Sequence, residues 1–182
     1  QQFAGYVADL SLQPRLAVKT LPSGGGQIFR RSGAGWEQFL EYSQEDSLTT
    51  SPLVIEGDGR TALLISAVGR DTAALVRVDL NTGAQTVVGE SARADVAEVW
   101  TDPRTNAPQA FGVNYLHTEL TPLTPQAAKD IERLRGALGP QFTVASRTLD
   151  DTRWVVVVDD PVHVLTSYLY DRESGQVTKL FD

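Results

Sequence analysis

Residues 51–90 read SPLVIEGDGRTALLISAVGRDTAALVRVDLNTGAQTVVGE, the pattern of four short strands joined by tight turns. Its apolar and β-branched runs are interrupted every few residues by Gly, Asp or Asn, which favour turns because they tolerate a positive φ. The expected strands span residues 52–56, 61–67, 74–79 and 85–88. Four antiparallel strands in about forty residues match one blade of a β-propeller.

The same arrangement returns at the C-terminal end, where the expected strands span residues 141–147, 153–158, 165–170 and 176–181. The hairpin signature VDLNTG of residues 78–83 reappears as YDRESG at 170–175, and TDPRTN at 101–106 is a degenerate third copy. We expect each Asp to accept hydrogen bonds from turn amides, and each final Gly or Asn to adopt the left-handed backbone. The residues predicted to form these turns, in a purely structural role, are Asp79, Gly83, Asp102, Asp171 and Gly175.

The remaining segments fit the pattern less completely. Residues 3–46 offer four strands, at 3–10, 15–20, 27–31 and 36–42, whereas residues 94–122 offer three, at 96–100, 109–114 and 116–120. Residues 124–139 predict the one helix, since Thr124 can cap it and Gly139-Pro140 can stop it. Its apolar stripe is expected to pack on its own domain rather than on a partner. The opposite, charged face is predicted to hold Lys129, Asp130, Glu132, Arg133 and Arg135.

These patterns together predict an all-β fold, a partial β-propeller of about four blades of four antiparallel strands with one short inserted helix. The expected blades span residues 3–46, 51–90, 94–122 and 141–182, and the helical insertion spans 124–139. The tryptophans at 36, 100 and 154 lie in apolar alternation, which favours core packing over a sugar-stacking role.

Composition excludes several classes of function. The 182 residues contain 16 Lys and Arg against 23 Asp and Glu, for a formal net charge of −7, and no basic cluster suited to nucleic acid. No apolar run approaches the roughly 20 residues that span a membrane. With no Cys, thiolate metal sites and cysteine nucleophiles are absent. The first residue is Gln1 rather than Met, which suggests processing, trimming or a piece of a longer protein. The lack of Cys and of a signal sequence favours the cytoplasm.

Candidate catalytic and metal-binding residues are few, and none forms a convincing set. Only His117 and His163 could serve as a base, and GESAR at residues 89–93 departs from the G-x-S-x-G elbow, so Ser91 is expected to be a turn residue. His117 and Glu119 could share a strand face, but two ligands do not make a metal site. The turn aspartates form no calcium loop, and the glycines at 24–26 lead into a strand rather than a helix. We therefore predict no catalytic, cofactor-binding or metal-binding residue and no cofactor.

The order of these motifs resembles a known family. Residues 94–96, 100–105, 108–110, 142–156 and 167–175, together with 59–61 and 69–75 upstream, resemble the β-propeller region of bacterial prolyl oligopeptidase-family serine peptidases, including members similar to acylaminoacyl-peptidases. The similarity runs from about Pro14 to Phe181, and the run SRTLDDTRW at 146–154 is its most specific part.

The resemblance implies a two-domain enzyme in which the propeller covers the active site of an α/β-hydrolase domain and filters peptide substrates. No triad residue matches within this chain, so the chain alone is expected to be inactive. The expected partners are the remaining propeller blades, the hydrolase domain and, through these, peptide substrates. An incomplete ring would expose apolar sheet faces, which also predicts self-association. The alternative is a stand-alone propeller-like module that binds proteins or acts as a scaffold.

Overall fold

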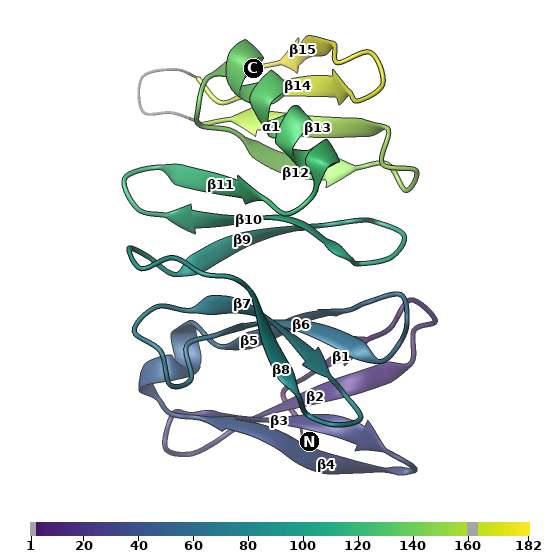
Figure 1. Ribbon diagram of the computed structural model, residues 1–182, viewed down its shortest axis with the longest axis vertical. Coiled ribbons are helices and arrows are strands. Elements are labelled where there is room, and N and C mark those ends of the chain that lie inside the picture. The colour runs from purple at the N-terminus through teal and green to yellow at the C-terminus, as the bar shows by residue number, and fades with distance from the viewer. Residues whose placement is uncertain (1–2, 160–163) are drawn as a thin grey trace. The chain divides into compact units, whose positions relative to one another are not determined.

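A computed structural model describes residues 3–159 and 164–182 (Figure 1). The chain divides into two compact units: unit 1 extends to Ala97 and includes Thr105–Ala107, and unit 2 comprises Glu98–Arg104 and Pro108–Asp182. Strands are the main regular secondary structure of both units. In the described residues no helix is long and apolar enough to cross a membrane.

Unit 1 contains two four-stranded antiparallel sheets. The first has the order β1-β2-β3-β4 and the second the order β5-β6-β7-β8, so neighbours in sequence pair throughout. A 3-10 helix, η1 (Glu45–Leu48), which the sequence pattern did not predict, lies between the two sheets in the chain. The strand bounds are β1 Gly5–Ala8, β2 Pro14–Thr20, β3 Gly26–Ser32, β4 Gly35–Tyr42, β5 Ser51–Ile55, β6 Thr61–Ser66, β7 Ala74–Asp79 and β8 Gln85–Gly89.

The core of unit 1 forms where the inward faces of its two sheets meet. Leu16 and Ile28 from the first sheet pack with Ile55, Leu64 and Val76 from the second, and all five are almost fully buried. Burying such side chains contributes about 1.5–3 kcal/mol each. The central strands β6 and β7 are buried on both faces, since consecutive residues along each of them are almost fully buried, which accounts for their continuous apolar runs.

Unit 2 contains a three-stranded sheet, a helix and a four-stranded sheet. The strands are β9 (Val96–Thr101), β10 (Pro108–Asn114) and β11 (Thr118–Pro122), then β12 (Thr143–Arg147), β13 (Arg153–Val158), β14 (Thr166–Asp171) and β15 (Val177–Phe181). The orders are β11-β10-β9 and β12-β13-β14-β15, so one sheet has three strands rather than the four of a full blade. Buried Trp100 and Trp154 lie in the core of this unit, as their apolar surroundings predicted. The same prediction is wrong for Trp36 of β4, which is only half-buried and lies outside both core clusters.

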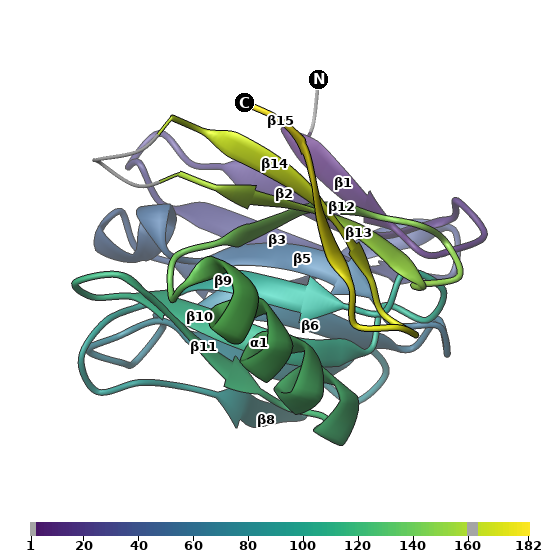
Figure 2. The same cartoon turned by 90° about the horizontal axis from the view of Figure 1, so that it is seen from above.

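Helix α1 (Pro125–Leu138) follows β11 and runs beside it, where a fourth strand would lie (Figures 1 and 2). The Thr124 hydroxyl accepts a hydrogen bond from the Ala127 amide, which caps the helix as predicted. Arg135 Nη2 donates to the Leu120 carbonyl of β11 at 3.2 Å. The helix therefore protects an edge strand that would otherwise present unpaired backbone groups.

The apolar stripe of α1 packs on its own unit, as expected, with Ile131 and Leu134 in the core. One prediction for the helix is wrong. Asp130, which was placed on the charged outer face, is fully buried. Asp130 follows Ala127 by three residues and precedes Leu134 by four, a spacing that puts all three on one helix face. Its burial requires charged and polar partners, and these form the candidate site.

Sheets β5–β8 and β12–β15 have the same two turns, one between their first two strands and one between their last two. In the second sheet these turns carry residues of the candidate site. The turn between the first two strands of each sheet closes with the same two hydrogen bonds, and the signature turn between the last two strands bonds back to it in the same way. The repeated bonds are Glu56 N to Thr61 O, Gly59 N to Glu56 O and Leu80 N to Arg60 O in one sheet, and Thr148 N to Arg153 O, Asp151 N to Thr148 O and Arg172 N to Thr152 O in the other.

Candidate functional site: a buried ionic network beneath a surface pocket

Four charged side chains of unit 2 meet in its interior. Asp130 comes from α1, Arg147 from β12, Asp151 from the β12–β13 turn and Arg172 from the β14–β15 turn. The two carboxylates are at most 4% exposed and the two guanidinium side chains at most 13%. Two positive and two negative charges balance, which is the condition for holding such groups away from water.

Asp130 ties helix α1 to the sheet. Its Oδ2 accepts from both Nε and Nη2 of Arg172 at 2.9 Å, and its Oδ1 accepts from the Tyr170 hydroxyl at 2.8 Å. Gln126 Nε2, one turn earlier on the helix, donates to the same carboxylate at 3.2 Å. Charge-assisted hydrogen bonds of this kind are roughly twice as strong as neutral ones. They therefore fix the position of α1 relative to sheet β12–β15.

Asp151 is the second anchor of Arg172. Arg172 Nη1 lies 2.5 Å from Asp151 Oδ2 and donates to the Asp151 carbonyl at 2.9 Å. The indole Nε1 of Trp154 donates to Asp151 Oδ1 at 2.7 Å, and Gln109 Nε2 donates to Oδ2 at 3.2 Å. Arg147 Nη1 lies 3.6 Å from the same carboxylate and donates to Gln109 Oε1 at 2.6 Å. Asp151 thus collects partners from β10, β12, β13 and the β14–β15 turn.

The guanidinium groups also stack on aromatic rings. Arg147 Cζ lies 4.1 Å from the ring centroid of Trp154, and Arg172 Cζ lies 4.7 Å from it. Trp154 makes edge-to-face contacts with Trp100 and Tyr170, both at 5.5 Å between centroids. Cation–π contacts are stronger when the groups are desolvated. These rings therefore help to stabilise the two buried guanidinium groups.

Burial and charge shift two pKa values in this network. Burial lowers the pKa of the Arg147 guanidinium despite the opposing effect of the Asp151 charge. Burial, reinforced by the hydrogen bond to Asp130, raises the pKa of Tyr170 to about 12. Among the described residues no buried side-chain polar atom lacks a hydrogen-bond partner. The charged groups of the network are therefore occupied by one another. Their role is to hold α1, the β12–β13 turn and the β14–β15 turn in position.

Sequence reasoning identified Asp151 and Arg172 only as turn residues and did not identify the network. Comparison of the two repeated turn pairs supplies the missing signal. The positions of Asp151, Trp154, Tyr170 and Arg172 correspond to Gly59, Ala62, Val78 and Leu80 in sheet β5–β8, by the shared turn bonds and strand register. The same backbone geometry forms with small and apolar residues in sheet β5–β8. The four polar and aromatic residues at these positions in sheet β12–β15 are therefore not required by the turns, and they serve instead to attach α1.

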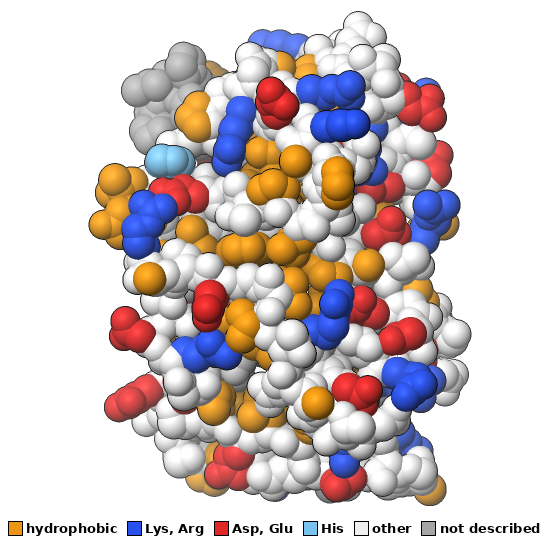
Figure 3. Space-filling model, viewed as in Figure 1, with side chains coloured by type: hydrophobic (Ala, Val, Ile, Leu, Met, Phe, Trp, Pro, Cys, Tyr) orange, Lys and Arg blue, Asp and Glu red, His pale blue; other side chains and the backbone are white. Residues whose placement is uncertain are grey.

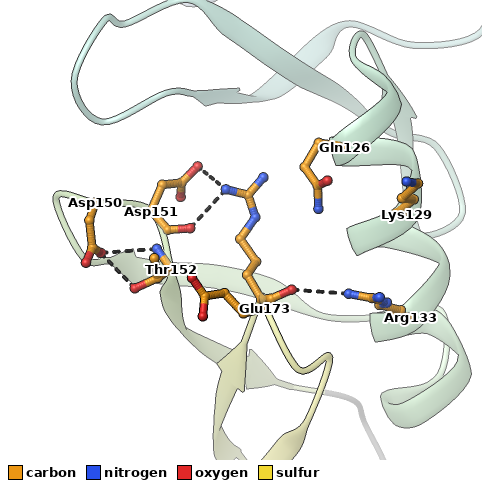
Figure 4. Close-up of a pocket in the computed structure, with 8 residues that line it drawn as sticks. Gln126, Lys129, Arg133, Asp150, Asp151, Thr152 and Glu173 are labelled. Atoms are coloured by element: carbon orange, nitrogen blue, oxygen red, sulfur yellow. Dashed lines mark hydrogen bonds and ion pairs between the residues drawn. The ribbon is translucent and has the colours of Figure 1, made fainter.

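A surface pocket of about 400 Å³ lies above the network. Gln126, Lys129 and Arg133 of α1 line one side of it, and the β12–β13 turn lines the other (Figure 4). Arg133 Nη1 donates to the Arg172 carbonyl at 3.2 Å, so the helix also contacts the β14–β15 turn directly. The remaining lining residues are Asp150, Asp151, Thr152, Arg172 and Glu173.

The predicted turn residues lie in turns with repeated geometry. Asp79 Oδ1 accepts from the amides of residues 81 and 82, and Asp171 Oδ1 accepts from that of residue 174. Gly83 and Gly175 adopt φ of 78° and 74°. Asp102 Oδ1 accepts from the amide of residue 104, but its turn joins β9 to β10, the first two strands of its sheet. The third signature copy therefore occupies a different hairpin position from the other two.

The residues considered for catalysis or metal binding lie apart from the network. Ser91 follows β8, and its hydroxyl accepts from the Arg93 amide at 3.2 Å, as in a turn. His117 lies in the bend before β11, whereas Glu119 lies within that strand, so the two residues do not share a strand. His163 lies outside the described residues. Nowhere in residues 3–159 and 164–182 do three or more acidic or histidine side chains converge as a metal-binding group.

No family model matches the chain. A curated relative, dipeptidyl aminopeptidase BIII of Pseudoxanthomonas mexicana, is 42% identical over 182 residues, which cover 99% of this chain and 26% of the relative. The solved structure of a puromycin-hydrolyzing peptidase of Mycobacterium tuberculosis aligns over 100% of this chain and 29% of its own, with a TM-score of 0.61 and 12% identity. The chain is homologous to the β-propeller region of prolyl oligopeptidase-family peptidases.

The propeller fold is supported by a second kind of protein. TolB of Acinetobacter baumannii aligns over 91% of this chain and 40% of its own with a TM-score of 0.56 and 13% identity, a likeness of fold alone. The predicted partial β-propeller is therefore confirmed as a fold class. The chain spans about a quarter of the length of the curated peptidase relative that it matches.

Proposed function

We propose that this propeller region is a non-catalytic part of a longer serine peptidase, in which it covers the hydrolase active site and admits only short peptides. The observation that carries the proposal is the 42% identity across nearly the whole chain to a quarter of a dipeptidyl aminopeptidase. The side chains of unit 2 support a positional rather than a catalytic role, because its buried charged groups are saturated by one another.

A second part of the proposal concerns the partners of unit 1, which we infer to be further blades of the same protein. On sheet β1–β4, Val7, Leu16 and Ile28 face the core with sheet β5–β8. Tyr6 and Phe29 alternate with them and so lie on the opposite face.

The rings on that opposite face form a connected cluster, which we call the aromatic face: Phe3, Tyr6, Phe29 and Trp36. Phe3 contacts the other three rings with centroid distances of 5.1–5.7 Å. Tyr6 is 55% exposed, and Arg31 Cζ lies 5.2 Å above the Trp36 ring. Aromatic and Arg side chains are enriched in the energetic centres of interfaces, which favours the packing of another apolar sheet here.

The proposal is tested with the intact protein encoded by the gene. We expect it to hydrolyse a dipeptidyl-4-nitroanilide, and to release the same dipeptide from the N-terminus of a folded protein many-fold more slowly. Equal rates on both substrates would contradict the filtering role. An intact protein without activity on either substrate, under conditions that keep it folded by circular dichroism, would favour the stand-alone binding or scaffold module instead.

A further inference from the structure

The pocket above the ionic network has two walls of opposite charge. Helix α1 supplies the basic wall through Lys129 and Arg133, and the turns supply an acidic wall through Asp150 and Glu173 (Figure 4). Lys and Arg side chains gather over α1 on the molecular surface as well (Figure 3). Such a field favours a ligand with separated positive and negative ends, because a ligand of one sign would meet repulsion from one wall.

The floor of the pocket is already in place. Asp130 and Asp151 hold Arg172 from two sides, and the Arg172 carbonyl also accepts from Arg133. Side chains held in this way cannot turn to fill the pocket when it is empty. A preformed site loses less conformational entropy on binding than one that must be assembled.

Two charged groups on the walls remain available for a ligand. Among residues 3–159 and 164–182, neither the Lys129 ammonium nor the Glu173 carboxylate makes a hydrogen bond or ion pair. By contrast, Asp150 is occupied by the hydroxyls of Thr148 and Thr152. The position of Glu173 corresponds to Asn81 in sheet β5–β8, so the turn itself does not require an acid there.

We propose that this pocket binds a short peptide through its two charged ends, with Lys129 receiving the terminal carboxylate and Glu173 the terminal ammonium. The volume of about 400 Å³ lies within the range of roughly 300–1,000 Å³ that is usual for small-ligand pockets. The inference rests on the proposed function for its choice of ligand, since peptides are the substrates and products of the proposed enzyme.

The test is a titration of the 182-residue chain with the dipeptide Ala-Ala, followed by ¹H–¹⁵N correlation spectra. The indole N–H of Trp154 is the reporter, because it donates to Asp151, which lines the pocket. The indole N–H of Trp36 in unit 1 is the internal reference. We expect a saturable shift of the Trp154 resonance with a Kd of about 1–10 mM, as suits a pair of exposed ionic contacts, and no shift of the Trp36 resonance.

Variants and blocked peptides assign the contacts. Lys129→Gln should weaken binding of Ala-Ala several-fold but leave the already weak binding of its C-terminal amide unchanged. Glu173→Gln should also weaken binding of Ala-Ala several-fold, but it should leave the already weak binding of the N-acetylated peptide unchanged. Lys19→Gln and Glu132→Gln, at exposed positions outside the pocket lining, are the matched controls and should bind like the unmodified chain.

Absence of a saturable Trp154 shift at 50 mM peptide, roughly five times the weakest Kd expected, would overturn the proposal. Equal binding of the free, amidated and acetylated peptides would overturn it too. These binding measurements do not depend on hydrolysis. A negative result would therefore reject the pocket but not the proposed peptidase function, which the hydrolysis assay tests separately. Conversely, binding without any activity of the intact protein would retain the pocket and reject the peptidase.

Discussion

Asp151 and Gly59 occupy the same position in equivalent turns and share the left-handed backbone, with φ of 58° and 66°. An L-residue adopts this conformation at an energetic penalty of roughly 1 kcal/mol, which glycine does not bear. Asp151 persists there because its carboxylate bonds Arg172, Trp154 and Gln109. The strain of one turn is therefore offset by the network that holds α1.

This relationship predicts that substitutions at both positions destabilise the chain, but by different amounts and for different reasons. Asp151→Gly relaxes the backbone, yet we expect it to lower the free energy of unfolding by about 2–4 kcal/mol, because Arg172 and Arg147 lose a buried counter-charge. Gly59→Ala, which only adds strain, should cost about 1 kcal/mol. Urea denaturation followed by tryptophan fluorescence measures both. A gain of stability in Asp151→Gly would show that backbone strain outweighs the network.

Arg172 should be the most sensitive charged residue in unit 2. Arg172→Ala leaves Asp130 and Asp151 buried without their main counter-charge, and we expect a loss of about 3–5 kcal/mol. The matched control is Lys179→Ala, which removes an ion pair to Asp182 that is 54% exposed on both sides and should cost less than about 1 kcal/mol. Equal losses in the two variants, measured by urea denaturation, would refute the buried network.

Asp150 should make the β12–β13 turn sensitive to acid. The hydroxyls of Thr148 and Thr152, together with the Thr152 amide, lower the pKa of Asp150 to about 2 from its ordinary value of 3.8. A lowered folded-state pKa means that the stabilisation is present above pH 3.8 and is lost as the pH falls through about 2. A ¹³C titration of the Asp150 carboxyl should show this value, and Thr148→Val should raise it. A midpoint near 3.8 in the unmodified chain would contradict the hydrogen bonds described.

The aromatic face of unit 1 should promote association of the purified chain when other blades are missing. We expect sedimentation velocity to show concentration-dependent dimers or larger species, because exposed aromatic surface favours burial. Tyr6→Ser, which removes the most exposed ring of the face, should shift the distribution toward monomer. The control Tyr115→Ser changes a Tyr that is 52% exposed in unit 2 and should leave association unchanged. A chain that remains monomeric at high concentration would contradict the interface.

The strand pattern could be predicted from the sequence because each strand is short and bounded by residues that favour turns. The same local signals placed α1, since Thr124, Pro125 and Gly139 mark its ends independently of tertiary contacts. Burial of Asp130 could not be predicted this way. An aspartate on a helix is ordinarily solvated, and only its pairing with Arg172, 42 residues later, makes the interior acceptable.

The pocket could not be predicted by local reasoning either, because Lys129 and Glu173 line one pocket only after the helix packs on the sheet. A comparison of internal copies was the available signal. The two sheets form equivalent turn hydrogen bonds, but Arg172 stands where the other sheet has Leu80, and Asp151 where it has Gly59. The residues that differ are the ones that form the ionic network. Repeated backbone with altered chemistry is thus more informative about this site than any single motif.

The gene sequence beyond the codon for Asp182 tests most directly whether the chain is part of a longer peptidase. We predict that the reading frame continues into a hydrolase domain with a G-x-S-x-G motif on a strand-to-helix turn, followed by an Asp and then a His. A reading frame that closes directly after Asp182, with no such domain encoded, would contradict the account.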